Sequence, residues 1–577
     1  MKSAFLSLLL PAWLRAYPRA CWPADLSAGV LVAILVIPQS LAYALLAGLP
    51  PQYGLYVSIF PVLAYAWFGS SRVQAVGPVA ITAIMTYAVL APLAVPGSAA
   101  YLALAAALSL LSGALVLACG LLRLGFLSQL LSRPVASGFI SGSAVLIVLS
   151  QCKHLLGVPV AGHGVVEQLP ALVGALPATN PVTLAIGGGS LLLLALARRY
   201  LGGGLRRLGM RGAHADFVVR LQPLLLLLLA TLAVSYGELD RRFAVAVIGQ
   251  IVAGLPPLDW TPPDWGILRL LFVPACTMTL VGMVQNLSMA QALAVKRGER
   301  IDANAELRGL GIANLVAGVY GGMPVGGGVS RSAVNVAAGA QTQLASIVTA
   351  LSTILLVLWA APWLARLPLA VLAASIVLAA WSMIDLAALR QAWAYDRADA
   401  CAWLGTACGV IFLGVDVGIG LGVLLSLATL LFHASQPHIA VIGRLPGSEH
   451  FRNVDRHRVE TLPGVLFLRI DESLFFGNLA AIETRIRQQL AAQPGCRELV
   501  LVMSAVNRMD ATAVEALAEF DRDLGRSGVR LHLAEVKGPV QDRLQGTALW
   551  QELSGEVFLS ASAAFDSLAT DPAANPG

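Results

Sequence analysis

Long apolar runs alternate with short polar or glycine- and proline-containing segments from about residue 27 to residue 434. A helix needs roughly 20 apolar residues to cross the hydrocarbon core of a bilayer, and most of these runs approach that length. The pattern predicts a polytopic α-helical membrane protein with fourteen transmembrane segments in two groups of seven. The expected segments are 27–47, 52–69, 77–93, 99–121, 128–150, 180–197 and 222–237, then 271–293, 304–320, 329–340, 343–364, 368–383, 399–414 and 417–434.

Net charge divides the chain near residue 436. Residues 436–577 contain 14 Lys and Arg against 18 Asp and Glu, a net charge of −4, whereas the preceding 435 residues contain 24 and 14, a net charge of +10. Over the whole chain, hydrophobic residues make up 57% and charged residues only 12%, as is typical of membrane proteins. We therefore expect a cytoplasmic or interfacial N-terminal segment at 1–25, a membrane domain at 26–435 and a polar domain beyond it.

The basic residues of the membrane domain lie mainly in alternate loops. Those in the expected inside loops are Arg72, Arg123, Arg133, Arg198, Arg199, Arg206, Arg207, Arg211, Lys296, Arg297, Arg300, Arg308, Arg390 and Arg397. The first two outside loops, 48–51 and 94–100, carry no charge. The positive-inside rule then predicts that both termini are cytoplasmic. The pI near 9.0 reflects orientation in a lipid bilayer, and we expect no nucleic acid partner.

The third segment of each group is interrupted by glycine and proline. Groups of seven must face opposite ways across the membrane, which predicts an inverted repeat with repeat one at about 26–240 and repeat two at about 265–435. Broken segments at matching places in two such repeats indicate a transporter's binding site. The stretch Gly77-Pro78-Val79-Ala80 and the glycine run before Ser330 predict two half-helices whose amino ends point at each other near the midplane.

Arg331 follows that glycine run at the depth of the membrane. A charged side chain there is costly and usually faces the bundle interior or a pathway. Positive helix ends together with a guanidinium attract an anion, so we expect Ser330 and Arg331 to contact one. Arg331 could instead bond carbonyls that the broken helix leaves unpaired, and the two roles are compatible.

Strand and helix patterns alternate after residue 454. Strands are expected at 465–470, 499–503, 529–534 and 557–559, and helices at 478–490, 511–524, 540–544 and 561–568. This alternation predicts a small cytoplasmic α/β domain at 454–570, preceded by a linker at 436–453 and followed by a disordered tail at 571–577.

Catalytic and metal-binding patterns do not stand out in the sequence. The seven cysteines are scattered, most of them in apolar runs, and no spacing predicts a disulfide framework or a zinc site. No nucleophile–base pair, metal cluster or phosphate loop is recognisable. We therefore expect a protein that is not an enzyme and has no cofactor and no metal.

A series of short motifs runs through the membrane domain in a fixed order. They are Ile37–Ala44 (IPQSLAYA), Pro51–Tyr56 (PQYGLY), Gly69–Arg72 (GSSR), Gly77–Pro78 and Ser330–Ala333 (SRSA). Together they resemble the SulP anion permease family, whose human relatives form solute carrier family 26. The resemblance covers nearly the whole chain, and the polar tail resembles the STAS domain of that family.

The resemblance implies a uracil-permease-like 7+7 inverted repeat, in which a core domain moves against a gate domain in an elevator-like cycle. It also implies a homodimer and a small anionic substrate such as sulfate, bicarbonate, chloride or a dicarboxylate. The positions that match the family's substrate site are Gln39 and Tyr43 in the first segment, Val79 and Ala80 at the first half-helix, Gln285 in the eighth segment, and Ser330 and Arg331 at the second half-helix.

Two positions depart from the family pattern. Gln285 stands where members often carry a carboxylate. Because an amide does not titrate and hard cations prefer carboxylate oxygens, we expect no proton or sodium coupling through this residue. In the tail, Asp510-Ala511-Thr512 stands where bacterial relatives present a phosphorylatable serine. A phosphorylation switch is therefore expected to be absent unless Thr512 replaces that serine.

Three functions remain open from the sequence. The first is a secondary active transporter of small anions in the plasma or bacterial inner membrane, with sulfate the first candidate substrate. The second is an exchanger of bicarbonate and chloride, or of dicarboxylates, without cation coupling. The third is a membrane sensor or scaffold that acts through a cytoplasmic partner of the STAS domain. Flux in liposomes separates the first two from the third.

Overall fold

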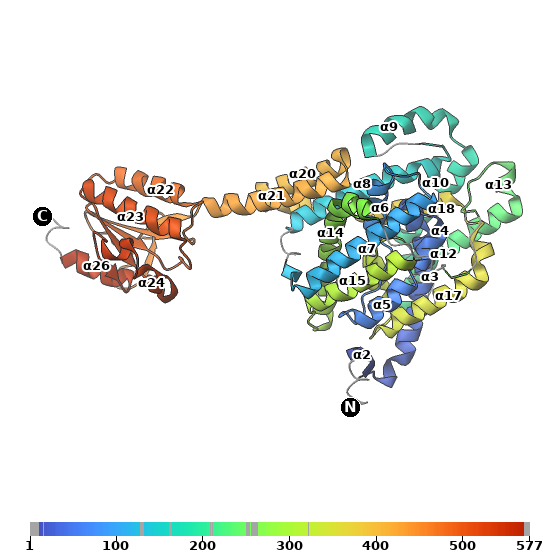
Figure 1. Cartoon of the computed structure of the whole chain (residues 1–577), viewed down its shortest axis with the longest axis horizontal. Coiled ribbons are helices and arrows are strands. Elements are labelled where there is room, and N and C mark those ends of the chain that lie inside the picture. The colour runs from blue at the N-terminus through green and yellow to red at the C-terminus, as the bar shows by residue number, and fades with distance from the viewer. Residues whose placement is uncertain are drawn as a thin grey trace. The chain divides into compact units, whose positions relative to one another are not determined.

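The computed structural model describes residues 11–15, 17–126, 132–160, 164–207, 209–210, 212–249, 254–255, 264–320 and 322–570. The chain forms two compact units, Met1–Ser426 and Leu427–Gly577, coloured blue to orange and orange to red in Figure 1. Residues 1–10 and 16 of the expected N-terminal segment lie outside the described residues, and so does the tail at 571–577 that we expected to be disordered.

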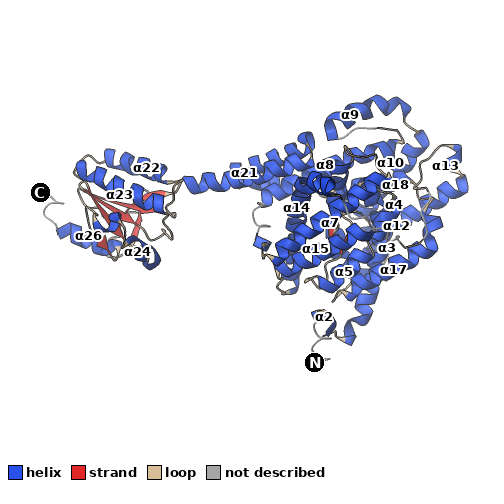
Figure 2. Ribbon diagram, in the orientation of Figure 1, coloured by secondary structure: helices blue, strands red, loops and turns tan. Residues whose placement is uncertain are grey.

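The first unit is built almost entirely of helices (Figure 2). They are α2 Ala12–Arg15, α3 Trp22–Leu46, α4 Pro51–Tyr56, α5 Phe60–Phe68, α6 Ala80–Leu90, α7 Ala99–Leu121, α8 Arg133–Leu156, α9 Gly164–Ala175, α10 Pro181–Leu196, α11 Gly202–Arg207, α12 Gly212–Gly237, α13 Leu239–Arg242, α14 Trp265–Arg297, α15 Ala303–Tyr320, α16 Val329–Ala337, α17 Leu344–Leu364, α18 Leu369–Trp381, α19 Leu386–Tyr395, α20 Arg397–Cys408 and α21 Val415–Ser435, the last of which continues into the second unit.

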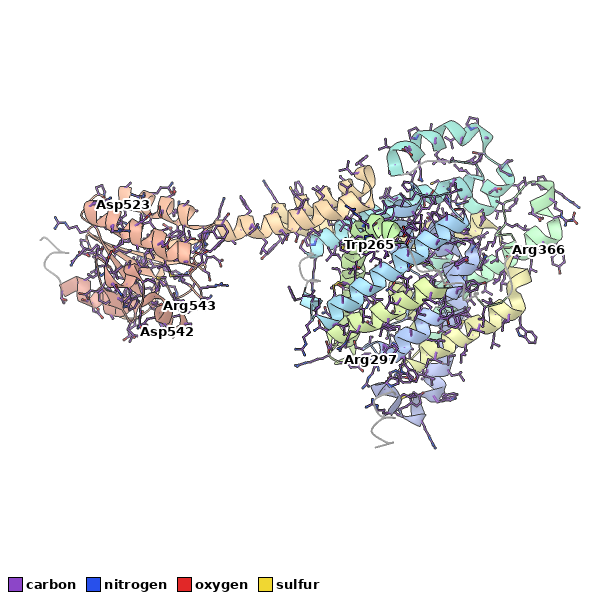
Figure 3. The ribbon with its side chains drawn as sticks, in the orientation of Figure 1. Trp265, Arg297, Arg366, Asp523, Asp542 and Arg543 are labelled. Atoms are coloured by element: carbon purple, nitrogen blue, oxygen red, sulfur yellow. The ribbon has the colours of Figure 1, made fainter. Side chains whose placement is uncertain are left out.

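Seven helical stretches within the described ranges are long and apolar enough to cross a membrane. Most of the other expected segments are shorter or divided. The expected segment 52–69 consists of α4 and α5, and the two glycine-rich segments form only α6 and α16. The sequence did not predict the helices α9, α13 and α19 between segments. By contrast α14, whose ends Trp265 and Arg297 are labelled in Figure 3, is longer than a bilayer requires.

Glycines join the helices of the first unit into two closely packed groups. A Cβ added at Gly113 of α7 would lie 2.6 Å from the amide nitrogen of Leu315 on α15. A Cβ added at Gly138 of α8 would lie 2.4 Å from the carbonyl oxygen of Trp403 on α20. Small residues let helix backbones approach closely within membranes. One group thus contains α7 and α15, and the other contains α8 and α20.

A two-stranded ribbon lies between the two broken segments. Strand β1 (Val76–Gly77) pairs antiparallel with β2 (Gly326–Gly327), and each strand leads into the helix that follows it, β1 into α6 and β2 into α16. Because the strands are antiparallel, the two helices leave the ribbon in opposite directions.

The second unit is a six-stranded sheet with the strand order β4-β3-β5-β6-β7-β8, drawn in red in Figure 2. Strands β5 to β8 are parallel, whereas β3 and β4 are antiparallel to their neighbours. The strands are β3 Ile439–Arg444, β4 Phe451–Asn453, β5 Val465–Ile470, β6 Glu498–Val502, β7 Arg530–Ala534 and β8 Val557–Phe558, and the helices are α22 Leu479–Ala491, α23 Ala511–Arg526, α24 Gly538–Leu544, α25 Ala548–Gln551 and α26 Ala561–Thr570.

The expected linker at 436–453 contributes two of these strands. Ile439 pairs with Ile470, so β3 extends the sheet beyond β5. Only three residues, Gln436, Pro437 and His438, separate β3 from α21. The place of this strand in the sheet depends on its pairing with β5, which the sequence pattern does not show.

Asp510 is the N-cap of α23. Its Oδ1 accepts a hydrogen bond of 2.8 Å from the amide of Ala513, and Thr512 beside it is exposed. A carboxylate at a helix amino end satisfies an otherwise unpaired amide. The Asp510-Ala511-Thr512 sequence thus has a structural role at this position. Whether the phosphorylation switch is absent stays a prediction.

Candidate functional site

Both predicted half-helices are present, and their first amides are available for bonding. The first intrahelical bonds run from the amide of Ala83 to the carbonyl of Val79 and from the amide of Ser332 to the carbonyl of Gly328. The amides of residues 80–82 and of Arg331 precede these bonds and donate to no other described residue. Unpaired amides at a helix start are a positive pole.

Arg331 lies between the two helix starts. Its side chain is 4% exposed, and its Nη2 donates to the carbonyl oxygen of Pro78, 2.5 Å away. A Cβ added at Gly77 would lie 2.3 Å from Nη1, and one added at Gly328 would lie 2.6 Å from Nε. Both glycines are therefore needed for the guanidinium to occupy this place.

The contact with Pro78 supports the carbonyl-bonding role that we considered for Arg331. A guanidinium has five N–H donors, and the described residues accept from one of them. The remaining donors can serve a ligand, so the two roles are compatible in this geometry.

Helix α3 brings Tyr43 to the same place. Tyr43 lies close enough to Arg331 for the two side chains to interact electrostatically. Gln39 precedes Tyr43 by one helical turn and so shares its face. It is half-buried, and its amide makes no hydrogen bond to another described residue. The adjacent Ser40 is instead bonded to Ser58, 2.7 Å away.

Helix α14 places Asn286, and not the expected Gln285, against the ribbon. Asn286 is fully buried, and its Oδ1 accepts from Nε2 of Gln74 at 2.7 Å. A Cβ added at Gly327 of β2 would lie 2.9 Å from this Oδ1. Gln285 is half-buried and makes no hydrogen bond to another described residue. The structure therefore places Asn286 against the site and leaves the contact proposed for Gln285 untested.

The remaining predicted residues lie at the helix starts. Val79 is the N-cap of α6 and is 5% exposed, and Ala80 is the first residue of that helix. Ser330 is in the first turn of α16, but its side chain is outside the described part of the structure. These three positions can contribute backbone amides or helix ends to the site.

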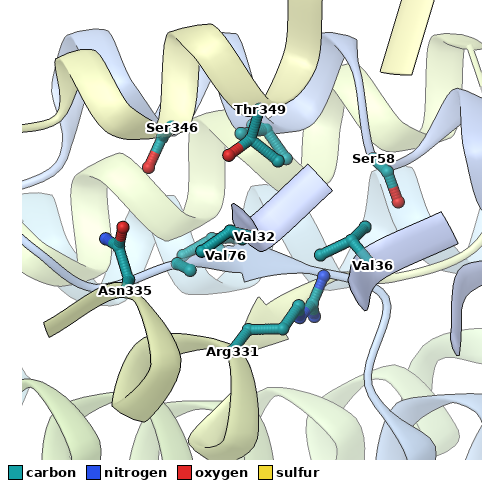
Figure 4. Close-up of a pocket in the computed structure, with 10 residues that line it drawn as sticks. Val32, Val36, Ser58, Val76, Arg331, Asn335, Ser346 and Thr349 are labelled. Atoms are coloured by element: carbon teal, nitrogen blue, oxygen red, sulfur yellow. The ribbon is translucent and has the colours of Figure 1, made fainter. Parts of the chain in front are cut away.

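A small cavity of about 10 Å³ lies beside Arg331, enough for about one water molecule. Figure 4 shows Arg331 extending toward Val36, with Asn335 and Ser346 on the opposite side of this view. The cavity is lined by Val32, Val36, Ser58, Val62, Ala75, Val76, Arg331, Asn335, Ser346 and Thr349. In this conformation it is too small for an anion of several atoms.

Side chains of α16 and of the segment after it hold the loop that leads into the first half-helix. The amide of Ala75 donates to Oγ of Ser332 at 3.0 Å, and Nδ2 of Asn335 donates to the carbonyl of Val73 at 2.9 Å. Nε2 of Gln343 donates to the carbonyl of Ser71 at 2.7 Å. The sequence does not predict these contacts, because they join residues more than 250 positions apart.

Glu306 is the other residue that the sequence analysis missed. It is fully buried at the start of α15 and bonds to the loop that precedes the ribbon. One signal was present in the sequence, since Glu306 is the only acidic residue in positions 303–384. Within the described ranges no group of three His, Cys, Asp or Glu residues could hold a metal ion.

Comparisons with known proteins agree with this architecture. The sulfate permease family profile matches residues 23–406, and the STAS domain profile matches residues 456–564. A probable sulfate transporter of Mycobacterium tuberculosis is 34% identical over 549 residues, 95% of each chain. The chloroplastic sulfate transporter 4.1 of Arabidopsis thaliana is 33% identical over 538 residues, 90% of this chain and 76% of that protein.

A solved structure shares the fold. The murine solute carrier 26 family member A9, described as an anion transporter in the inward-facing state, superposes with a TM-score of 0.87 over 98% of this chain and 95% of that chain, at 23% identity. The family profile covers most of the membrane domain, and the relatives cover almost the entire chain. The chain therefore belongs to the sulfate permease family, as a helical membrane protein with a C-terminal STAS domain.

Proposed function

We propose that this protein is a secondary active transporter of small anions, with sulfate as the first candidate substrate. The observation that carries the proposal is the position of Arg331 between the amino ends of α6 and α16. Anion oxygens would accept from its free N–H groups and from the first amides of both helices. Tyr43 and Gln39 would border the same site from α3. The names of the two sulfate-transporting relatives support this choice of substrate.

Transport requires the site to open, because the cavity holds only about one water molecule in this conformation. The two glycine-joined groups of helices could each move as a unit, since close backbone packing resists internal rearrangement. An elevator-like movement of the group with α7 and α15 against the group with α8 and α20 would then carry the ribbon across the membrane. We include in this proposal the fourteen-segment inverted repeat, a homodimer, and an orientation in the plasma or bacterial inner membrane with both termini cytoplasmic.

An exchange mode without cation coupling is the second candidate. The neutral amide of Gln285 stands in place of a titratable carboxylate, which favours exchange of bicarbonate, chloride or a dicarboxylate over symport. A sensor or scaffold acting through the STAS domain would need no flux at all.

Counterflow in proteoliposomes tests these alternatives. Vesicles loaded with unlabelled sulfate, bicarbonate, chloride or succinate are mixed with each labelled anion, with and without proton and sodium gradients. We expect saturable sulfate counterflow that Arg331→Ala abolishes, with Arg390→Ala, an exposed residue of α19, as the control. Absence of flux for every anion in well-folded protein would contradict transport and favour the scaffold.

A further inference from the structure

Glu306 is bonded on both carboxylate oxygens. Its Oε2 accepts from the amide and the Oγ of Ser70, at 3.1 and 2.7 Å, and from the amide of Ser71 at 3.1 Å. Its Oε1 accepts from the hydroxyl of Tyr65 at 2.5 Å and from Nδ2 of Asn286 at 2.9 Å. Five donors thus converge on one carboxylate that is fully buried.

This arrangement suits a fixed carboxylate. An ionised carboxylate only accepts hydrogen bonds, whereas a protonated one must also donate. Every described group around Glu306 already donates to it, so an added proton would displace one of the five bonds. Glu306 lies in the first turn of α15, where an acidic residue could simply complement the helix dipole. Its oxygens, however, bond to α5, to the loop after α5 and to α14.

The bonds continue from Glu306 to the ribbon. Asn286 donates to Glu306 and accepts from Gln74, so its amide is used at both ends. A Cβ added at Gly327 would lie only 2.0 Å from Nε2 of Gln74. The chain of hydrogen bonds therefore ends at Gln74, whose side chain packs against the backbone of β2 at Gly327, one residue before Gly328 and the start of α16.

We propose that Glu306 is the positioning residue of the anion site. It holds the Ser70-Ser71 turn directly and, through Asn286 and Gln74, holds the ribbon that carries both half-helix starts. This inference rests on the proposed function. It assigns to Glu306 the role of fixing the geometry of the site.

Exchanging the carboxylate of Glu306 and the amide of Asn286 separates this positioning role from a merely structural one. In Glu306→Gln the amide oxygen can keep the bonds to Ser70 and Ser71, but the new NH₂ group meets the NH₂ group of Asn286. Asn286→Asp in the same chain restores an acceptor there and still accepts from Gln74. The double variant can therefore keep the bonds to Ser70, Ser71 and Gln74 and restore the one between residues 306 and 286, while the Tyr65 hydroxyl must accept from the new NH₂ group instead of donating. The negative charge moves from residue 306 to its hydrogen-bond partner at 286.

Isothermal titration with sulfate, on full-length protein in nanodiscs, tests the proposal. We expect Glu306→Gln and Asn286→Asp each to raise the Kd at least tenfold, and the double variant to return within about threefold of wild type. Glu299→Gln is the control. Glu299 lies between the last residue of α14 and the first residue of α15, but it pairs with Arg297 at 3.3 Å on a partly exposed surface. If either single variant does not fold, the Kd of the double variant decides.

Two results would overturn the inference. They are an unchanged Kd in a folded Glu306→Gln variant and a folded double variant whose affinity stays as weak as that of the single variants. Absence of sulfate binding by the wild type would instead count against the proposed function itself, so the two failures are distinguishable.

Discussion

Substitution of Gly328 by alanine tests the placement of Arg331 without removing its charge. The backbone of Gly328 is extended, with φ −82° and ψ 115°, so alanine fits it without strain. The added Cβ would lie 2.6 Å from Nε of Arg331, whereas ordinary contact begins near 3.4 Å. The guanidinium must therefore retreat by about 0.8 Å. A retreat directly away from Pro78 would lengthen that bond from 2.5 Å to about 3.3 Å, beyond the usual range.

The size of the effect follows from the bonds at risk. Hydrogen bonds to charged groups contribute about 1.5–3 kcal/mol, so losing one bond to the anion weakens binding by roughly 10- to 150-fold. Stability should change less, because the displaced atoms belong to a side chain that can rotate. We expect the Kd for sulfate to rise by about tenfold or more while the protein stays folded.

The assay is sulfate titration of purified protein in nanodiscs, with thermal unfolding measured on the same samples. Gly282→Ala is the matched control, since a Cβ at this position of α14 meets nothing within 4 Å, and its Kd should stay within about twofold of wild type. Wild-type affinity in Gly328→Ala, alongside weak binding in Arg331→Ala, would refute the reasoning. Anion affinity would then depend on the presence of Arg331 but not on the position of its guanidinium beside Pro78 and Gly328.

Three further predictions follow from other parts of the chain. Gln285→Glu should make sulfate uptake respond to an imposed proton gradient to which the wild type is insensitive, and a strong response in the wild type would contradict the exchange mode. Removal of residues 436–577 should leave sulfate affinity near that of the full chain and slow turnover, whereas lost binding in a folded sample would mean that the STAS domain shapes the site. In the second unit burial raises the pKa of Asp471, but hydrogen bonds from Arg469 and His438 outweigh this effect and lower it overall. Asp471→Asn should therefore lower the free energy of unfolding of the isolated unit near neutral pH. Chemical unfolding should show this difference from wild type disappearing as the pH falls through the lowered pKa of Asp471. A difference that persists below that pKa would argue against the ion pair.

The half-helices were predictable because their signal is local. Glycine and proline break an apolar run within a few residues, and Arg331 stands out as a charge within such a run. Glu306 and Asn286 are different, because Glu306 looks like an ordinary acidic residue in the first turn of a helix and Asn286 like an ordinary polar residue within one. Their importance comes from partners on other helices, such as Ser70, which lies 236 positions from Glu306. Sequence patterns of period 3.6 do not report such pairings.

The boundary of the second domain shows a related limit. The parallel strands and their helices were recognisable because each alternates with the next over a short distance. Strand β3 was missed since it follows α21 closely, and its place in the sheet depends on pairing with β5. This is also why a truncation should begin at residue 436, because a cut at 454 would leave β3 and β4 without the rest of the sheet.

The central claim is that an anion binds between the two half-helix starts, in contact with Arg331. Selenate is a sulfate analogue whose selenium can be located by anomalous diffraction from crystals of the wild-type protein. We predict a selenium peak with oxygens within hydrogen-bond distance of the Arg331 guanidinium and of an amide at Ala80 or Ser330, and no such peak in Arg331→Ala. A peak elsewhere in the membrane domain that survives Arg331→Ala, in protein that still transports sulfate, would contradict the account.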